Sequence, residues 1–337
     1  MSKHLTVSAC SLLTLALFTS TALADHARKP DDHAPAGVMG DHLHKQGEWM
    51  VGYTYDHTHM SGLRNGNDNA NTNQVLGFYG EAATKMDMDM HMFEIMYGVT
   101  DDLTLMVMPQ YMEMSMTHKS LHGGGHMHEH KVSGFGDTEV TGLYSVYRTE
   151  GARAHLNLGL SLPTGSTDET FANHHDVIYH LPYNMQLGSG TFDPILGATY
   201  AAEMGEWSWG AQTINYLRLG QNDEGYRQGN KYTATAWAAH NLTEFASLSF
   251  RLKGEAWGDV HGRDASLLLT TIAGADPDEQ AGERVMALVG VNLMADEEWA
   301  LKGHRLAAEF GLPVYERYSG PQPDTDYKLT LSWQWAF

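Results

Sequence analysis

Methionine and histidine, the residue types with the clearest capacity for chemistry in this chain, are concentrated in its first 130 residues. Of 19 methionines, eleven lie between Met86 and Met127, and of 20 histidines, twelve lie between His26 and His130. A thioether is a soft ligand that selects Cu(I), whereas imidazole suits Cu(II), Zn(II) and Ni(II). The two side chains together predict copper as a ligand or as a cargo.

The methionines recur with a period of two, which places them on one face of two neighbouring strands. A turn at 98–102 joins the strands into a hairpin, so the two methionine faces should lie side by side. Branched and aromatic residues such as Phe93, Ile95 and Val107 occupy the other face and fit lipid better. We therefore expect the methionines to line a lumen. The predicted thioether ligands are Met86, Met88, Met90, Met92, Met96, Met106, Met108, Met112, Met114 and Met116.

A glycine-rich stretch with five histidines follows the second methionine strand. On a flexible loop, these imidazoles can surround a metal ion in several geometries. Two other interpretations stay open, because methionine is also an adaptable apolar filler and a histidine loop can bind metals without selection. The predicted imidazole ligands are His118, His122, His126, His128 and His130.

The elements that must position these residues are strands, because apolar and polar residues alternate along most of the chain. Short turns and longer loops also alternate, as they do in outer-membrane barrels with short periplasmic turns and long external loops. We predict an all-β fold in which residues 48–337 form an up-and-down antiparallel β-barrel of about twelve strands. The expected strands are 48–57, 85–97, 103–117, 133–147, 153–163, 185–202, 207–219, 231–240, 246–257, 283–295, 303–313 and 326–337.

Both ends of the chain carry targeting signals. Residues 1–24 combine a basic start, an apolar run and the ending Ala22-Leu23-Ala24, which is typical of a secretory signal peptide. The last strand ends in Phe337 and resembles the signal read by the barrel assembly machinery. We therefore predict the bacterial outer membrane as the location, with its lipids and that machinery as partners. The His- and Asp-rich segment 25–47 is expected to be disordered.

Charge and cysteine content exclude several classes of function. The net charge of −20 repels phosphate backbones, which excludes nucleic acid as a partner. The only cysteine, Cys10, lies in the signal, so the mature chain has no disulfide and no thiolate site. Residues 173–176 are the one local cluster that hints at catalysis, and no serine stands beside their histidines. We predict no enzyme, no catalytic residue and no cofactor other than copper.

Several glycine-containing motifs occur between residue 130 and the C-terminus. They resemble a group of uncharacterised outer-membrane channels that are loosely classed with the putative transport proteins of meta-cleavage phenol degradation. The resemblance implies a single outer-membrane barrel that moves small solutes, and it carries over no catalytic residues. The motifs are Gly134-Phe135-Gly136-Asp137, the stretch from Leu158 to Gly165, the stretch from Leu187 to Asp193, Gly311-Leu312-Pro313-Val314-Tyr315 and Gly320-Pro321.

The expected function is an outer-membrane channel or transporter for small solutes, with copper the favoured cargo or ligand. One alternative keeps the channel but gives it a hydrophobic or aromatic cargo, for which the methionines are an adaptable apolar lining. A second alternative is a metal-binding surface barrel that transports nothing because its lumen is plugged.

Overall fold

The computed structural model describes residues 29–121, 125–172, 178–267, 269, 271–295 and 301–337. No helix among these residues is long and apolar enough to cross a membrane. The short helices are α1 (Thr72–Val75), η1 (Tyr183–Met185), η2 (Ala273–Ala275) and η3 (Pro277–Glu279). The strands are β1 (Trp49–Gly66), β2 (Asp68–Asn69), β3 (Glu81–Thr100), β4 (Leu103–Met108), β5 (Gln110–Ser120), β6 (Met127–Phe135), β7 (Thr138–Arg148), β8 (Ala152–Leu162), β9 (Thr170–Ala172), β10 (Ile178–His180), β11 (Asp193–Met204), β12 (Trp207–Tyr216), β13 (Tyr226–Arg227), β14 (Lys231–Thr243), β15 (Ala246–Trp257), β16 (His261–Gly262), β17 (Gly282–Met294) and β18 (His304–Ala336).

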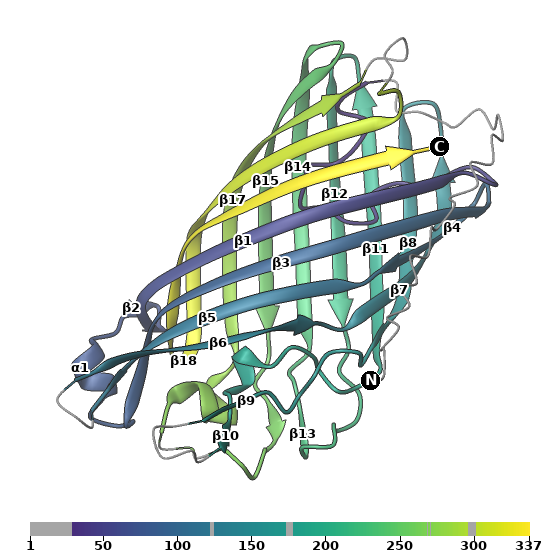
Figure 1. Ribbon diagram of the computed structural model, residues 1–337. Coiled ribbons are helices and arrows are strands. Elements are labelled where there is room, and N and C mark those ends of the chain that lie inside the picture. The colour runs from purple at the N-terminus through teal and green to yellow at the C-terminus, as the bar shows by residue number, and fades with distance from the viewer. Residues whose placement is uncertain (1–28, 122–124, 173–177, 268, 270, 296–300) are drawn as a thin grey trace, which may run out of the picture.

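The long strands form one antiparallel sheet that closes into a barrel (Figure 1). The order around the wall is β1-β18-β17-β15-β14-β12-β11-β8-β7-β4-β3, and pairing of β3 with β1 closes the ring. Closure pairs the backbone groups of neighbouring strands, which is a requirement for any β structure in lipid. The predicted antiparallel barrel is confirmed.

Local sequence explains how the strands map onto the wall. Pro109 cannot donate a backbone hydrogen bond and separates β4 from β5, while Gly136 and Asp137 separate β6 from β7. The 33-residue β18 folds back on itself, so that residues 305–318 pair with β17 and residues 322–336 pair with β1. With β4/β5 and β6/β7 each counted once and the halves of β18 counted separately, the chain crosses the wall twelve times.

Some predicted boundaries are wrong in an informative way. The strand expected at 185–202 begins only at Asp193, because residues 185–192 belong to a loop that turns into the lumen. The loops expected at 58–84 and 118–132 are shorter, since β1 continues to Gly66, β5 continues to Ser120 and β6 begins at Met127. These hairpins carry the wall well beyond the length that a bilayer requires.

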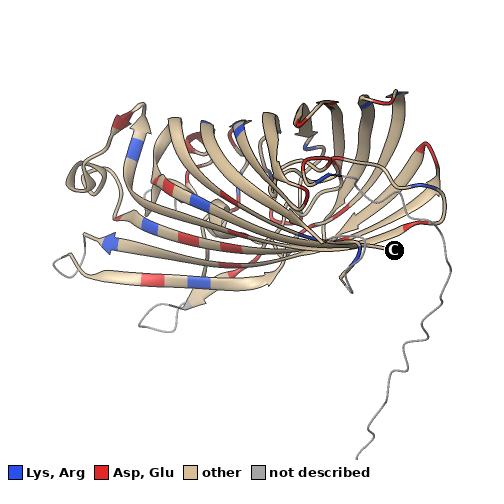
Figure 2. Cartoon of the chain, turned by 90° about the horizontal axis from the view of Figure 1, so that it is seen from above, with Lys and Arg blue, Asp and Glu red and all other residues tan. Residues whose placement is uncertain are grey.

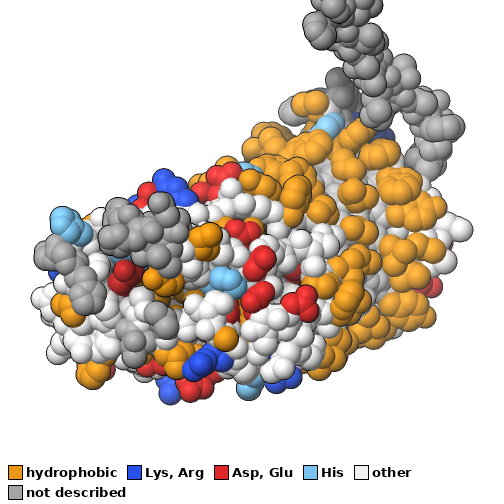
Figure 3. Space-filling view, turned by 60° about the horizontal axis from the view of Figure 1, so that its bottom comes forward, with side chains coloured by type: hydrophobic (Ala, Val, Ile, Leu, Met, Phe, Trp, Pro, Cys, Tyr) orange, Lys and Arg blue, Asp and Glu red, His pale blue; other side chains and the backbone are white. Residues whose placement is uncertain are grey.

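The barrel has a turn end, where the strands are joined by short turns and the C-terminus lies, and a loop end, where the long connections lie (Figure 1). Apolar side chains cover the outer surface of the half nearer the turn end (Figure 3). Along β3, outward Phe93 and Ile95 give way to Lys85, Asp87 and Asp89. Charged residues accordingly cross neighbouring strands in bands away from the C-terminal end (Figure 2). The apolar belt is the surface that fits lipid.

Residues 29–47, here called the plug, run inside the barrel at the turn end. The plug is buried over most of its length, and inward-pointing side chains of the wall bind its backbone. The contacts include Arg305 with the Ala34 carbonyl, Gly37 N–H donating to Glu309 Oε2 at 3.2 Å, and Asn157 donating to the Gly40 carbonyl at 3.0 Å. The expectation of disorder is therefore wrong for 29–47, because the barrel supplies the partners that the segment lacks by itself. Residues 25–28 and the predicted signal peptide lie outside the described residues.

Candidate functional site

The predicted methionines of β3, β4 and β5 lie on the inner face of the barrel, and eight of the ten stand opposite one another, while Met92 is opposite Gln110 and Met108 is opposite Glu139 of β7. Side chains at opposed positions of antiparallel strands have Cβ atoms about 4.5–5.5 Å apart. The ten residues therefore form a two-column array, here called the methionine ladder. Its opposed pairs are Met86–Met116, Met88–Met114, Met90–Met112 and Met96–Met106. Alternation placed these side chains on the correct face, while metal binding by them stays a prediction.

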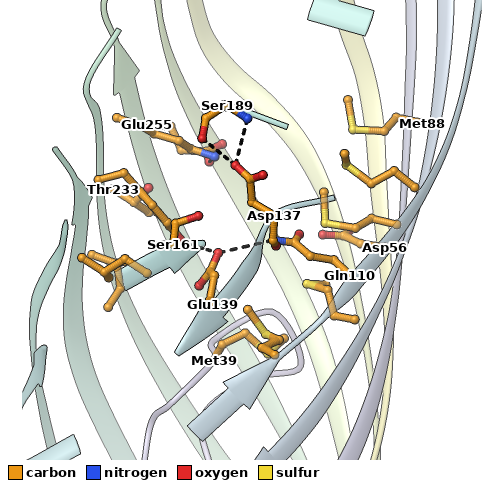
Figure 4. Close-up of a pocket in the computed structure, with 18 of the residues that line it drawn as sticks. Met39, Asp56, Met88, Gln110, Asp137, Glu139, Ser161, Ser189, Thr233 and Glu255 are labelled. Carbon is orange, nitrogen blue, oxygen red and sulfur yellow. Dashed lines mark hydrogen bonds and ion pairs between the residues drawn. The ribbon is translucent and has the colours of Figure 1, made fainter. Parts of the chain in front are cut away.

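A cavity of about 530 Å³ lies in the lumen beside the ladder. In Figure 4, Met88 and Asp56 stand on one wall, and Thr233 and Glu255 stand on the wall across from it. One wall is thus soft and largely apolar, and the other is polar. The ladder residues that line the cavity are Met88, Met90, Met92, Met106, Met108, Met112 and Met114.

The polar wall carries an excess of positive charge. Glu255 Oε1 lies 3.0 Å from Lys253 Nζ and 3.5 Å from Lys231 Nζ, and its Oε2 lies 2.9 Å from an Arg284 nitrogen. One carboxylate among three cations leaves positive charge facing the cavity, so this wall favours anionic groups.

The inward loop, residues 181–192, closes the cavity from the loop end. Its buried Leu181, Tyr183, Met185 and Leu187 belong to the same apolar cluster as Met86, Met114 and Met116 of the ladder. The ladder is therefore bounded by this loop on one side and by the plug on the other.

Asp137 holds the inward loop in place. Its Oδ2 accepts hydrogen bonds from the Ser189 N–H at 2.8 Å and the Ser189 hydroxyl at 2.6 Å (Figure 4). Its Oδ1 accepts from the Gly165 N–H at 3.1 Å. Gly165 and Gly188 approach so closely that a Cβ on Gly188 would stand 2.4 Å from the Gly165 carbonyl oxygen. Three of the glycine motifs thus meet at one point.

Three histidines gather above the ladder at the loop end. The ring of His118 on β5 lies 5.3 Å from that of His128 and 4.9 Å from that of His130, both on β6. Glu81 Oε2 lies 3.2 Å from His128 Nε2, and Glu81, His128 and His130 each offer a ligand atom within 4.8 Å of the others. His118 is buried, and neither of its ring nitrogens has a hydrogen-bond partner. These four residues are here called the outer cluster.

The outer cluster lies beyond the apolar belt, and its environment favours the neutral form of His118 and His130. Burial, together with the nearby His130 and His128, lowers the pKa of His118 to about 3. Burial and His128 lower the pKa of His130 to about 4. Because a metal binds the unprotonated imidazole, both side chains are ready for coordination at neutral pH.

The prediction that five histidines lie on a flexible loop is wrong for three of them. His118, His128 and His130 lie on paired strands, whereas His126 is exposed in the turn and His122 lies outside the described residues. Glu81 was missed because a bulge between Ala83 and Lys85 shifts the register. The two-residue period counted back from Met86 would place Glu81 on the outer face.

The comparisons with known proteins identify the family. The family model described as the putative MetA-pathway of phenol degradation matches residues 64–275. An outer-membrane channel from Pseudomonas putida F1 has a similar structure, with a TM-score of 0.60 and 17% identity over 89% of this chain and 99% of that one.

A second solved structure, the transport unit of the autotransporter AIDA-I from Escherichia coli, gives a TM-score of 0.50 and 11% identity over 89% and 93% of the two chains. No curated protein matches the chain. These likenesses show a shared fold, and the family match covers more than half of the sequence. The chain therefore belongs to the family of the putative MetA-pathway of phenol degradation and is a β-barrel of the bacterial outer membrane.

Proposed function

We propose that this barrel carries small solutes across the outer membrane and that Cu(I) is the cargo handled along the methionine ladder. One observation carries the proposal: the ladder continues without interruption into the outer cluster, because Met116 is directly opposite His130 across β5 and β6. Apolar packing alone would be served equally well by leucine. A file of thioethers that ends at imidazoles instead matches the ligand preferences of copper.

The order of groups supports a path from the outside inward. If the turn end faces the periplasm, as is usual for such barrels, an incoming cation first meets His57 and His59 on the outer face. These histidines contact Asp89 and Asp87 at 2.8 and 2.5 Å. The outer cluster would then capture the ion, and the paired thioethers would pass it along. Conduction needs several sites that each bind weakly, and thioether pairs meet this requirement.

A second candidate cargo is an organic anion with an apolar or aromatic body. The two walls of the cavity favour it, since the methionines would contact the apolar part and the cations around Glu255 would contact an acidic group. The cavity volume also lies within the range of small-molecule sites. The family description, which refers to phenol degradation, agrees with such a cargo.

Replacement of Met88, Met90, Met112 and Met114 by leucine tests the copper proposal, because leucine keeps the volume and removes the sulfur. A control replaces three methionines away from the ladder and the inward loop: Met204, Met286 and Met294. Cu(I) binding is measured by competition with a chromogenic chelator, and Cu(I) uptake is measured in proteoliposomes that contain a trapped chelator. We expect the affinity for Cu(I) and the rate of Cu(I) uptake each to fall at least tenfold in the ladder variant and to stay unchanged in the control.

Unchanged Cu(I) binding and uptake in the ladder variant would refute copper as the cargo. Benzoate uptake that survives the leucine replacements and falls in a Lys253→Met variant would then support the organic anion. Copper binding without uptake of either solute would support the metal-binding surface barrel.

A further inference from the structure

The plug carries a second group of histidines, at the opposite end of the ladder from the outer cluster. The ring of His42 lies 4.3 Å from that of His33 and 4.8 Å from that of His44. His33, Asp41 and His42 offer ligand atoms within 4.8 Å of one another. His42 and His44 are buried, with 9% and 6% of their surface exposed.

The free nitrogens of these rings point to a missing ligand. His42 Nδ1 lies 2.7 Å from Asp41 Oδ1, and because a carboxylate only accepts, the proton sits on Nδ1 and leaves the lone pair on Nε2. His42 Nε2, His44 Nε2 and His33 Nδ1 are all buried without a hydrogen-bond partner. A buried polar atom without a partner costs roughly 1–3 kcal/mol, and a metal ion bound to the three neighbouring imidazole nitrogens would offset that cost.

Asp41 has the position of a residue that prepares a metal ligand. A histidine that binds metal through one nitrogen commonly donates its other N–H to a carboxylate, which fixes the tautomer and the ring. Asp41 does this for His42, and its Oδ2 accepts from the Ala34 N–H at 2.7 Å. The carboxylate is thereby fixed to the other arm of the plug.

We propose that His33, His42 and His44 bind one divalent first-row transition ion, such as Cu(II) or Zn(II), with Asp41 orienting His42. Imidazole is the ligand of choice for these ions. The ion joins the two arms of the plug, because His33 precedes and His42 and His44 follow the bend at Gly37 and Gly40. Its effect is to hold the two arms of the plug together in the conformation that packs inside the lumen.

The position of the site gives the plug control over the ladder. A Cβ on Gly40 would stand 3.6 Å from Met106 Cε, and Leu43 packs on the cluster of Met96 and Met106. A plug held in this conformation therefore covers the turn end of the ladder, and loss of the ion loosens that cover. The inference holds whichever solute the barrel carries, since it concerns a resident divalent ion and not the cargo.

The test uses the full mature chain, refolded in detergent without a histidine tag, in a background with His118→Ala, His128→Ala and His130→Ala so that the outer cluster is silent. Cu(II) is titrated and followed by electron paramagnetic resonance, with His42→Ala/His44→Ala as the variant and His240→Ala/His261→Ala as the control. We expect one Cu(II) with nitrogen ligands in the background and in the control. The plug variant should bind Cu(II) at least tenfold more weakly.

Hydrogen exchange of residues 29–47 gives an independent readout. Zn(II) should increase protection of these amides in the background protein and leave them unchanged in the plug variant. Asp41→Asn, which retains all three imidazoles, should lower the affinity tenfold or more and covers the case in which the double variant fails to fold. Equal Cu(II) affinity in plug variant and background, or no Zn(II)-dependent protection of the plug, overturns the proposal.

Discussion

Asp137 accepts two hydrogen bonds from Ser189, a residue 52 positions further along the chain, and through them fixes the loop that closes the cavity. The same carboxylate accepts the N–H of Gly165 from the connection that precedes this loop. The strand break at Gly136 and Asp137 exposes the carboxylate to both partners. The strand break between β6 and β7 thus positions the inward loop that closes the candidate site.

Substitution of Asp137 by asparagine should loosen the inward loop, because a neutral amide replaces the charged acceptor. The amide N–H₂ group also cannot accept hydrogen bonds from the N–H and O–H groups that face it. Hydrogen bonds to charged groups contribute about 1.5–3 kcal/mol each, so we expect a loss of roughly 2–3 kcal/mol in the free energy of unfolding in urea. Exposed Asp223, on the connection between β12 and β14, provides the control variant Asp223→Asn, which should change stability by less than about 0.5 kcal/mol. Equal stability of the two variants would show that Asp137 does not hold the loop.

Alternation predicts the wall well because each strand buries one face and exposes the other. The strand expected at 246–257 matches β15, and the expected hairpin of 85–97 with 103–117 is present as β3 with β4 and β5. The strand expected to begin at residue 185 fails because Leu187, although apolar, packs inside the lumen on the ladder. The inward loop has the amino-acid composition of a strand, and it differs from one because its backbone does not pair with a neighbouring strand.

The candidate site is predictable where it depends on local period and unpredictable where it depends on contacts distant in sequence. The facing of the ladder follows from the spacing of its methionines. The plug does not, since its order depends on side chains such as Arg305 and Glu309, which are more than 250 residues away in the chain. Amino-acid composition indicates whether a segment can form a buried core by itself. The plug forms none without the barrel wall.

A buried ion pair connects the wall to the plug and should show strong coupling. Arg251 donates to both oxygens of Glu309, at 2.8 and 2.5 Å, and Glu309 also accepts the Gly37 N–H. Removal of one partner leaves the other charge buried and costs about 3–5 kcal/mol. We therefore expect Arg251→Leu and Glu309→Leu each to destabilise strongly and the double variant to lose less than the sum. Additive losses in urea unfolding would show that the pair is not coupled.

Acid should weaken the metal-free protein at its loop end. Histidine in the unfolded chain takes up a proton near pH 6.5, whereas His130 stays neutral down to a pKa of about 4 and His118 down to about 3. Below pH 6.5 the unfolded state therefore binds more protons, and the free energy of unfolding falls as the pH is lowered toward 4. Hydrogen exchange of β5 and β6 in the presence of a chelator measures this effect.

A His118→Asn variant isolates this contribution. It should show a weaker dependence of β5 and β6 protection on pH, because one of the two titrating groups is gone. His261→Asn, at an exposed position in the connection between β15 and β17, should keep the wild-type dependence. An unchanged slope in His118→Asn would place the acid sensitivity elsewhere.

Phe337 should matter for assembly. Phe337 N–H donates to the Trp49 carbonyl at 2.9 Å and its own carbonyl accepts the Trp49 N–H at 3.0 Å, so it completes the seam between the first and last strands. We expect deletion of Phe337 to slow assembly by the barrel assembly machinery in proteoliposomes, followed by the appearance of the heat-modifiable band. Phe310→Ala, which removes another outward aromatic side chain, is the control. Equal rates for the deletion and the wild type would exclude a role for Phe337 in assembly.

The plug should limit the flow of ions through the barrel. The addition of one methyl group at Gly98 can test this, because it would displace the plug. A Cβ on Gly98 would stand 1.9 Å from the Lys45 carbonyl oxygen, so Gly98→Ala must displace the plug while the strand itself accepts alanine. We expect this variant, and a chain that lacks residues 29–46, to conduct several-fold more current in planar bilayers than the wild type. Gly142→Ala is the matched control, because the nearest atom to its Cβ would lie 3.6 Å away. If Gly98→Ala and the deletion both conduct like the wild type, the inward loop and not the plug is the barrier to flow.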